Sequence, residues 1–152
     1  MDADLKKNLN RTLSEVFEKM FFTIIEPLPE PPAPEELMQE DHFEAIISFS
    51  GDREGSIRFY FPESLARYIT VNLSGRKSGQ LTEPQLLDTV RETANMAVGS
   101  LLGIVDPEGR CRLGIPESRR VDDLSPASLS SHPGVAVFNS ERGVLWLVYE
   151  GN

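Results

Sequence analysis

The stretch "LLDTVRETANMAVGSLLG", residues 86–103, has the residue spacing of a single amphipathic helix. With about 100° between successive residues, its apolar side chains gather on one side of that helix: Leu86, Val90, Ala94, Ala97 and Leu101. The other side carries a polar stripe within an arc of roughly 60°: Asp88, Glu92, Asn95 and Gly99. Because the apolar side has to face a protein core, we expect the polar stripe to face outward.

Both ends of this helix carry recognisable signals. Thr82 followed three residues later by Gln85 forms a capping box. Pro84 lies in the first turn, where a missing N–H costs no hydrogen bond. Gly103 is available as the C-terminal cap. These signals predict a helix of roughly twenty residues with well-marked ends.

The polar stripe has two interpretations. Polar residues on an exposed helix face are the rule, so ordinary solvated surface is the simpler one. Two details argue against it. Asp88 and Glu92 are like charges four residues apart, which costs a few tenths of a kcal/mol, and Gly99 inside a helix costs up to ~1 kcal/mol relative to alanine. A glycine there is favoured if the backbone of a partner has to come close.

The chain before this helix contains one further helix pattern, one hairpin and a short helix. Apolar residues recur at helical spacing within residues 4–25, and the helix should end before "EPLPEPPAPEE" (26–36), a proline-rich loop. Strand patterns at 43–51 and 55–61 flank the turn "GDREG" and predict a β-hairpin. A helix is expected over 62–75, with proline at its start and glycine just past its end.

After the 86–103 helix, a short strand over 110–117, broken by Pro116, precedes a loop. A second hairpin over 135–150 follows, and its last strand is apolar at nearly every position, as expected of a strand covered on both faces. This order predicts an α+β fold, a mainly antiparallel sheet with two long helices packed on one face. We expect one domain over residues 1–152, with 26–36 as a proline-rich loop insertion.

Composition limits the classes of function. The chain has 152 residues and a net charge of −9, so it repels phosphate backbones and general nucleic-acid binding is not expected. No apolar run approaches the ~20 residues of a membrane span, and "MFFTII" (20–25) stops at a Glu-Pro pair. The first ten residues lack the apolar core of a secretory signal. We therefore expect a cytoplasmic protein without membrane contact.

The stripe and three further segments together resemble a known family. The string Asp88-x-x-x-Glu92-x-x-Asn95-x-x-x-Gly99 resembles the signature of the chemotaxis phosphatases that include CheX, CheC and the flagellar-switch phosphatase FliY. The family's other elements are similar to "VFEKMF" (16–21), to "FSGDREGSIRFYFPESLARYITVNLSG" (49–75) and to "LGIPESRRVDD" (113–123). The resemblance covers most of residues 12–150, and the single copy of the motif points to CheX rather than CheC.

The resemblance implies an enzyme that hydrolyses the aspartyl phosphate of a CheY-type response regulator. It implies that Glu92 forms a salt bridge with the regulator's active-site lysine and that Asn95 holds the attacking water in line with phosphorus. Asp88 and Gly99 would support the site or contact the partner. No metal or cofactor of its own is implied, because the regulator supplies Mg²⁺. The family's CheX-like members form homodimers, and we expect the same here.

Other candidate residues and functions carry less. Cys111 lies between two arginines, which can lower a thiol pKa, but no histidine signature accompanies it, so we interpret it as structural. His42 and His132 make no convincing metal site with one cysteine.

The sequence leaves two rival functions open. One is a non-catalytic dimeric module that binds a regulator or flagellar-switch component, and the other is a dimeric scaffold that binds through the proline-rich loop at 27–34.

Overall fold

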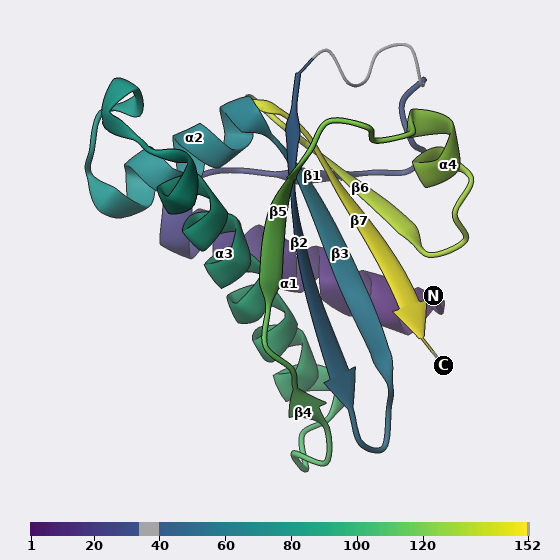
Figure 1. Ribbon diagram of the computed structural model, residues 1–152. Helices are drawn as coiled ribbons and strands as arrows, with labels where there is room; N and C mark the ends of the chain where they lie inside the picture. Colours follow the sequence, from purple (N-terminus) through teal and green to yellow (C-terminus); the bar gives the residue numbers. More distant parts are fainter. Residues whose placement is uncertain (34–39, 152) are drawn as a thin grey trace.

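The computed structural model describes residues 1–33 and 40–151, which form one layered structure of helices on a sheet (Figure 1). In chain order the helices are α1 (Ala3–Phe21), α2 (Glu63–Ser74), α3 (Glu83–Val105) and α4 (Pro126–Ser130), with a 3-10 turn at Ser78–Gln80. The strands are β1 (Glu26–Leu28), β2 (His42–Ser50), β3 (Gly55–Pro62), β4 (Arg112–Leu113), β5 (Glu117–Val121), β6 (Val135–Ser140) and β7 (Gly143–Gly151).

The strands form a single antiparallel sheet in the order β1-β6-β7-β3-β2-β4, with β5 also pairing with β2. Both predicted hairpins are confirmed as β2–β3 and β6–β7. The apolar last strand β7 lies between β6 and β3, as its sequence predicts. Because β7 pairs on both edges, its backbone hydrogen bonds are satisfied without solvent.

Helices α1, α2 and α3 cover one face of the sheet (Figure 1). The core between the two layers includes Leu13 and Phe17 from α1, Ile69 from α2, and Phe59 from β3, each less than 1% exposed. The predicted fold class, a mainly antiparallel sheet with two long helices on one face, is confirmed. One element lies on the opposite face: short helix α4 brings Leu129 against Trp146 in a second, smaller cluster.

The local signals explain why the helices begin and end where they do, with one exception. The predicted capping box is present, since Gln85 donates its N–H to Thr82 Oγ1 at 3.4 Å and Thr82 donates its N–H to Gln85 Oε1 at 2.8 Å. Gly75 ends α2 in the left-handed conformation. The prediction that Gly103 caps α3 is wrong: the helix continues to Val105 and Asp106 is the cap.

Three short elements were missing from the sequence prediction. Residues 26–28 of the predicted proline-rich loop form β1, which pairs with β6 at the edge of the sheet. Pro27 is tolerated there because an edge strand needs only one row of hydrogen bonds. The strand predicted over 110–117 is instead β4, and β5 begins only after Pro116. Helix α4 occupies part of a predicted loop. Residues 34–36 of the predicted loop lie outside the described residues.

The end of α1 has an unusual backbone. Phe22, the residue after the helix, has φ 52° and ψ 37°, and among the described residues it is the only non-glycine with a positive φ. The N–H of Thr23 closes the helix end on the carbonyl of Phe17 at 3.1 Å. A left-handed conformation costs an L-residue roughly 1–2 kcal/mol, so this helix end is strained by its own sequence.

Arg120 on β5 joins the starts of α2 and α3. Its guanidinium donates to Glu63 at the start of α2 at 2.8 Å, to Asp41 at 2.6 Å, and to Glu83 at the start of α3. The guanidinium also lies 4.8 Å from the centre of the Phe43 ring. The hydrogen bonds to Glu63 and Glu83 raise the pKa of Arg120 above its ordinary value, so the charge is permanent. This cluster fixes the start of α3 and therefore the direction of its outward face.

Candidate functional site

The outward face of α3 carries the four residues that the sequence analysis singled out. Asp88, Glu92 and Gly99 are exposed, and Asn95 is half-buried. The five residues assigned to the apolar side of the helix are at most 2% exposed: Leu86, Val90, Ala94, Ala97 and Leu101. The two sides of the helix are therefore separated as the spacing predicts, and one helical turn lies between Glu92 and Asn95.

Asp88 and Glu92 have different surroundings despite their similar chemistry. Asp88 forms an ion pair with Arg91 within the same helix. Arg91 also donates to Ser118 Oγ on β5 at 3.2 Å, and that hydroxyl in turn donates to the carbonyl of Leu87 at 3.0 Å. Glu92 makes no hydrogen bond or ion pair with any residue that the structure describes. Of the two acids, Glu92 is the one whose charge is available to a partner.

Asn95 lies at the rim of a groove between α1 and α3. The groove has a volume of about 530 Å³ and is lined by Thr12, Glu15, Val16, Lys19, Met20, Asn95, Met96, Gly99, Ser100, Ile104 and Leu113. Part of its apolar lining comes from α1 and from β4, which are other elements than the motif helix: Val16, Met20 and Leu113. The structure thus brings Asn95 and Gly99 together with Met20 and Met96 in one open surface depression, which Glu92 does not line.

Gly99 is not needed by the chain's own packing. A Cβ placed on it would meet only Leu113 Cδ2 at 3.7 Å, an ordinary van der Waals contact. Gly103, one turn further along α3, has no atom within 4 Å of such a Cβ. Both glycines therefore weaken the helix without relieving a clash inside this chain. For Gly99, which lines the groove, the space it leaves is open to a partner.

The remaining candidates lie apart from this groove. Cys111 donates its N–H to Asp106 at 2.7 Å, which is the largest cause of the lowered pKa of that carboxyl. His42 is buried with Nδ1 3.0 Å from the carbonyl of Glu40, and burial lowers its pKa. His132 lies 3.9 Å from Glu150. Over residues 1–33 and 40–151, no group of three or more His, Cys, Asp or Glu side chains is placed to hold a metal ion.

The sequence analysis missed the α1 side of the groove. Val16 and Met20 are part of the helical apolar pattern of residues 4–25, and that pattern does not distinguish residues under the sheet from residues along a neighbouring helix. Met20 is 37% exposed. The spacing between α1 and α3 that creates the groove depends on packing, so no local signal could have revealed it. None of the helices in the described part of the chain is long and apolar enough to span a membrane.

The sequence matches one protein-family model over more than half of its length. The family model described as chemotaxis phosphatase CheX matches residues 43–139, which include the whole of α3. The chain belongs to the CheX family. No curated protein matches the sequence.

Solved structures of chemotaxis proteins have the same fold. CheX from Desulfovibrio desulfuricans superposes with a TM-score of 0.74 at 16% identity, over 98% of this chain and 99% of that one. CheX from Vibrio vulnificus gives a TM-score of 0.72 at 20% identity, over 99% and 100%. CheX from Borrelia burgdorferi, in a complex with CheY, BeF₃ and Mg²⁺, gives 0.68 at 14% identity, over 99% of each chain. At these identities the likeness concerns the fold.

Proposed function

We propose that this protein hydrolyses the aspartyl phosphate of a CheY-type response regulator. The observation that carries the proposal is the outward pair on α3: Glu92 is exposed without an ion pair among the described residues, and Asn95, one turn later, borders an open groove. Membership of the CheX family, whose model is described as a chemotaxis phosphatase, supports the proposal. The solved complex of Borrelia burgdorferi CheX with CheY supports a regulator as the partner.

Glu92 docks the regulator. A carboxylate forms strong, charge-assisted hydrogen bonds with a cation. Asp88 holds Arg91 back toward β5, which leaves the carboxylate of Glu92 free to pair with the lysine of the regulator's active site. Because two charges pair most strongly where water is excluded, this contact forms as the two surfaces close.

Asn95 positions the attacking water. Phosphoryl transfer needs little covalent chemistry from a protein, and catalysis comes mostly from positioning and charge neutralisation. The amide can accept a hydrogen bond from water and donate another without ionising. Among the described residues no hydrogen bond occupies the Asn95 amide. Orienting one water in this way is worth ~2–4 kcal/mol. The regulator supplies the Mg²⁺, so this chain contributes two side chains to the reaction, Glu92 and Asn95.

The groove beside Asn95 is the surface on which the regulator rests. Its apolar lining from Val16, Met20, Met96 and Ile104 excludes water around the amide. Gly99 lets the partner's backbone approach α3 closely. We also propose that the protein works in the cytoplasm and as a homodimer, as expected from the family resemblance. A non-catalytic module that binds a regulator or flagellar-switch component through the same face is the second candidate, favoured only by the breadth of this groove.

The test is the decay of phosphate on a CheY-type regulator from the same organism, with Mg²⁺ and with catalytic amounts of the protein. We expect Asn95→Ala to lose about 30- to 1,000-fold in rate, which corresponds to ~2–4 kcal/mol. Glu92→Ala should mainly weaken regulator binding. Asn8→Ala and Glu18→Ala are matched controls, because both residues lie on α1, one half-buried and one exposed, outside this groove.

Two results would contradict the proposal in different ways. Equal decay with and without the wild-type protein removes the enzyme and leaves the binding module, provided that the regulator still binds. Full activity of Asn95→Ala, with the expected rate for the wild type, keeps the phosphatase and removes the assigned mechanism.

A further inference from the structure

A second surface lies at the end of α1, where residues 22–26 lead from the helix into β1. Buried and exposed residues alternate strictly along this segment. Thr23 and Ile25 face inward at 6% and 3% exposure, whereas Phe22 and Ile24 are 81% and 73% exposed. Two large apolar side chains of one short segment are therefore exposed to solvent. Neither contributes to the core.

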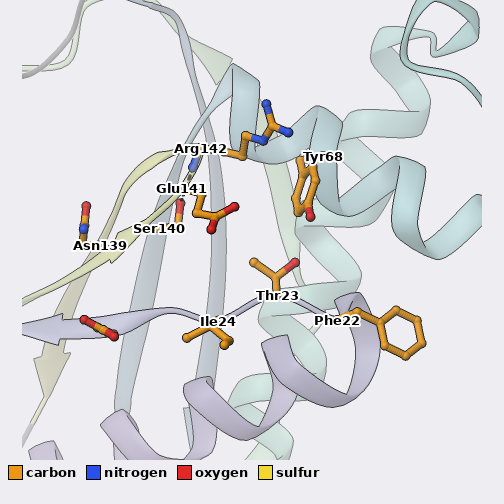
Figure 2. Close-up of a pocket in the computed structure, with 9 residues that line it drawn as sticks. Phe22, Thr23, Ile24, Tyr68, Asn139, Ser140, Glu141 and Arg142 are labelled. Carbon is orange, nitrogen blue, oxygen red and sulfur yellow. Dashed lines mark hydrogen bonds between the residues drawn. The ribbon is translucent and has the colours of Figure 1, made fainter.

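These side chains border a hollow between the segment, α2 and the β6–β7 turn (Figure 2). Its volume is about 390 Å³. Tyr68 of α2 lies at one end of the hollow, and Glu141 of the turn points toward Thr23 and Ile24 across it (Figure 2). Glu26, at the start of β1, also lines the hollow. The hollow shares no lining residue with the groove beside Asn95.

The charged side chains of this hollow differ in whether they have a partner among the described residues. The guanidinium of Arg142 lies 4.7 Å from the centre of the Tyr68 ring. The backbone N–H of Arg142 donates to Ser140 Oγ at 3.1 Å. Glu26 and Glu141 are exposed and form no ion pair with any residue in 1–33 or 40–151. A ligand therefore meets two free carboxylates beside two exposed apolar side chains.

We propose that this surface binds an extended peptide segment of another protein, in which an aliphatic or aromatic side chain is followed closely by lysine or arginine. The apolar side chain packs against Phe22 and Ile24, and the cation pairs with Glu141 or Glu26. Phe22 takes the place usual for glycine at a helix end. The sequence thus retains a strained residue whose ring is of no use inside the chain, which is the pattern expected of a binding surface.

A second copy of this chain is the poorer occupant. Pairing of the patch with itself about a two-fold axis brings the same residues of both copies together. Glu26 and Glu141 would then face their own equivalents, and Arg142, the cation among the described lining residues, is already held against the Tyr68 ring. A nucleic acid is disfavoured by the same carboxylates. A basic and apolar peptide is the ligand that both features attract.

The proposal is tested by selecting phage-displayed linear peptides of random sequence on immobilised wild-type protein. Phe22→Asn serves for counter-selection, because asparagine tolerates the left-handed conformation and keeps the fold. Enriched peptides should carry a large apolar residue within two positions of lysine or arginine. One of them, labelled with a fluorophore, should bind Phe22→Asn about tenfold more weakly by anisotropy. Glu141→Gln should lower the affinity several-fold at low salt and reduce its salt dependence, with Glu26 still charged.

Ile115→Asn is the matched control, because Ile115 is 90% exposed and does not line the hollow. This variant should bind the peptide like the wild type. Enrichment of the same peptides on Phe22→Asn, or of peptides without basic residues, overturns the proposal. A change in sedimentation of the unliganded protein on Phe22→Asn replacement overturns it in favour of self-association. None of these readouts depends on phosphatase activity.

Discussion

The outward face of α3 and the segment at residues 22–26 both carry groups without a partner among the described residues, but these groups differ in chemistry. On α3 the free groups are a carboxylate and an amide, Glu92 and Asn95. On the segment they are two apolar side chains, Phe22 and Ile24. The first surface is suited to water, charge and phosphoryl chemistry, whereas the second is suited to adhesion.

The difference shows what sequence patterns can detect. A polar stripe on a regular helix stands out because the 3.6-residue period assigns each residue to a side. The apolar run "MFFTII" at residues 20–25 has no such period across the end of α1, so the pattern does not assign its residues to a side. The structure divides it: Phe21 is less than 1% exposed and its neighbour Phe22 is 81% exposed.

The sharpest test of this division compares the two adjacent phenylalanines. Phe21→Ala should lower the free energy of unfolding by ~3–5 kcal/mol, because it opens a cavity in the core. Phe22→Gly should raise it by up to ~1 kcal/mol, because glycine accepts the left-handed conformation without strain. Urea unfolding followed by far-UV circular dichroism measures both. Equal losses for the two variants would show that the ring of Phe22 packs in solution.

The second test asks whether the two surfaces act independently. Asn95→Asp keeps the shape of the side chain and places a negative charge next to the phosphoryl group. The activation free energy of dephosphorylation should therefore rise by ~3 kcal/mol, which lowers the rate about a hundredfold or more. Phe22→Asn should leave that rate within about twofold in the absence of peptide. The initial rate of phosphate release from the regulator is the measurement. A large loss of dephosphorylation rate in Phe22→Asn would show that the two surfaces belong to one functional site.

A smaller effect separates the two glycines of α3. Gly99→Ala and Gly103→Ala should each stabilise the protein by up to ~1 kcal/mol, since neither Cβ meets a clash within the chain. Only Gly99→Ala should slow dephosphorylation, because only Gly99 lines the groove. Thermal unfolding and the regulator assay give the two readouts. Full activity of Gly99→Ala would mean that the regulator's backbone keeps its distance from this turn.

The smallest expected effect concerns the other acid of the stripe. Asp88→Asn removes an exposed pair with Arg91 and also a like charge four residues from Glu92, so the two contributions oppose each other. The free energy of unfolding, measured by urea titration, should change by less than ~0.5 kcal/mol. The dephosphorylation rate should fall less than tenfold, because Asp88 acts by holding Arg91 away from Glu92. A loss as large as that of Asn95→Asp would give Asp88 a direct part in the reaction.

Much of the fold could be predicted because its signals are local. The capping box at Thr82, the αL glycine at Gly75 and the turn "GDREG" each define an element boundary from a few neighbouring residues. The short elements could not be predicted. β1 is three residues long and contains Pro27, and its pairing with β6 joins residues more than a hundred positions apart. Such a strand exists only because the rest of the sheet is present.

The candidate site divides in the same way. The order of Asp88, Glu92, Asn95 and Gly99 along one face follows from helical geometry and was therefore predictable. The ion pair that occupies Asp88, the hydroxyl of Ser118 that holds Arg91, and the α1 side of the groove are tertiary contacts. The exposure of Phe22 depends on where α1 ends, and helix ends are the least certain part of any pattern.

The position of β7 also constrains how the polypeptide can be made. The last strand in the chain fills the gap between β3 and β6, so the sheet stays in two pieces until residues 143–151 have left the ribosome. Until then the apolar side of α1 is not fully covered by the sheet, and exposed apolar surface of this kind promotes aggregation or chaperone binding. Completing this sheet thus requires the insertion of β7 between β3 and β6, a non-local pairing that is slow compared with the formation of a helix.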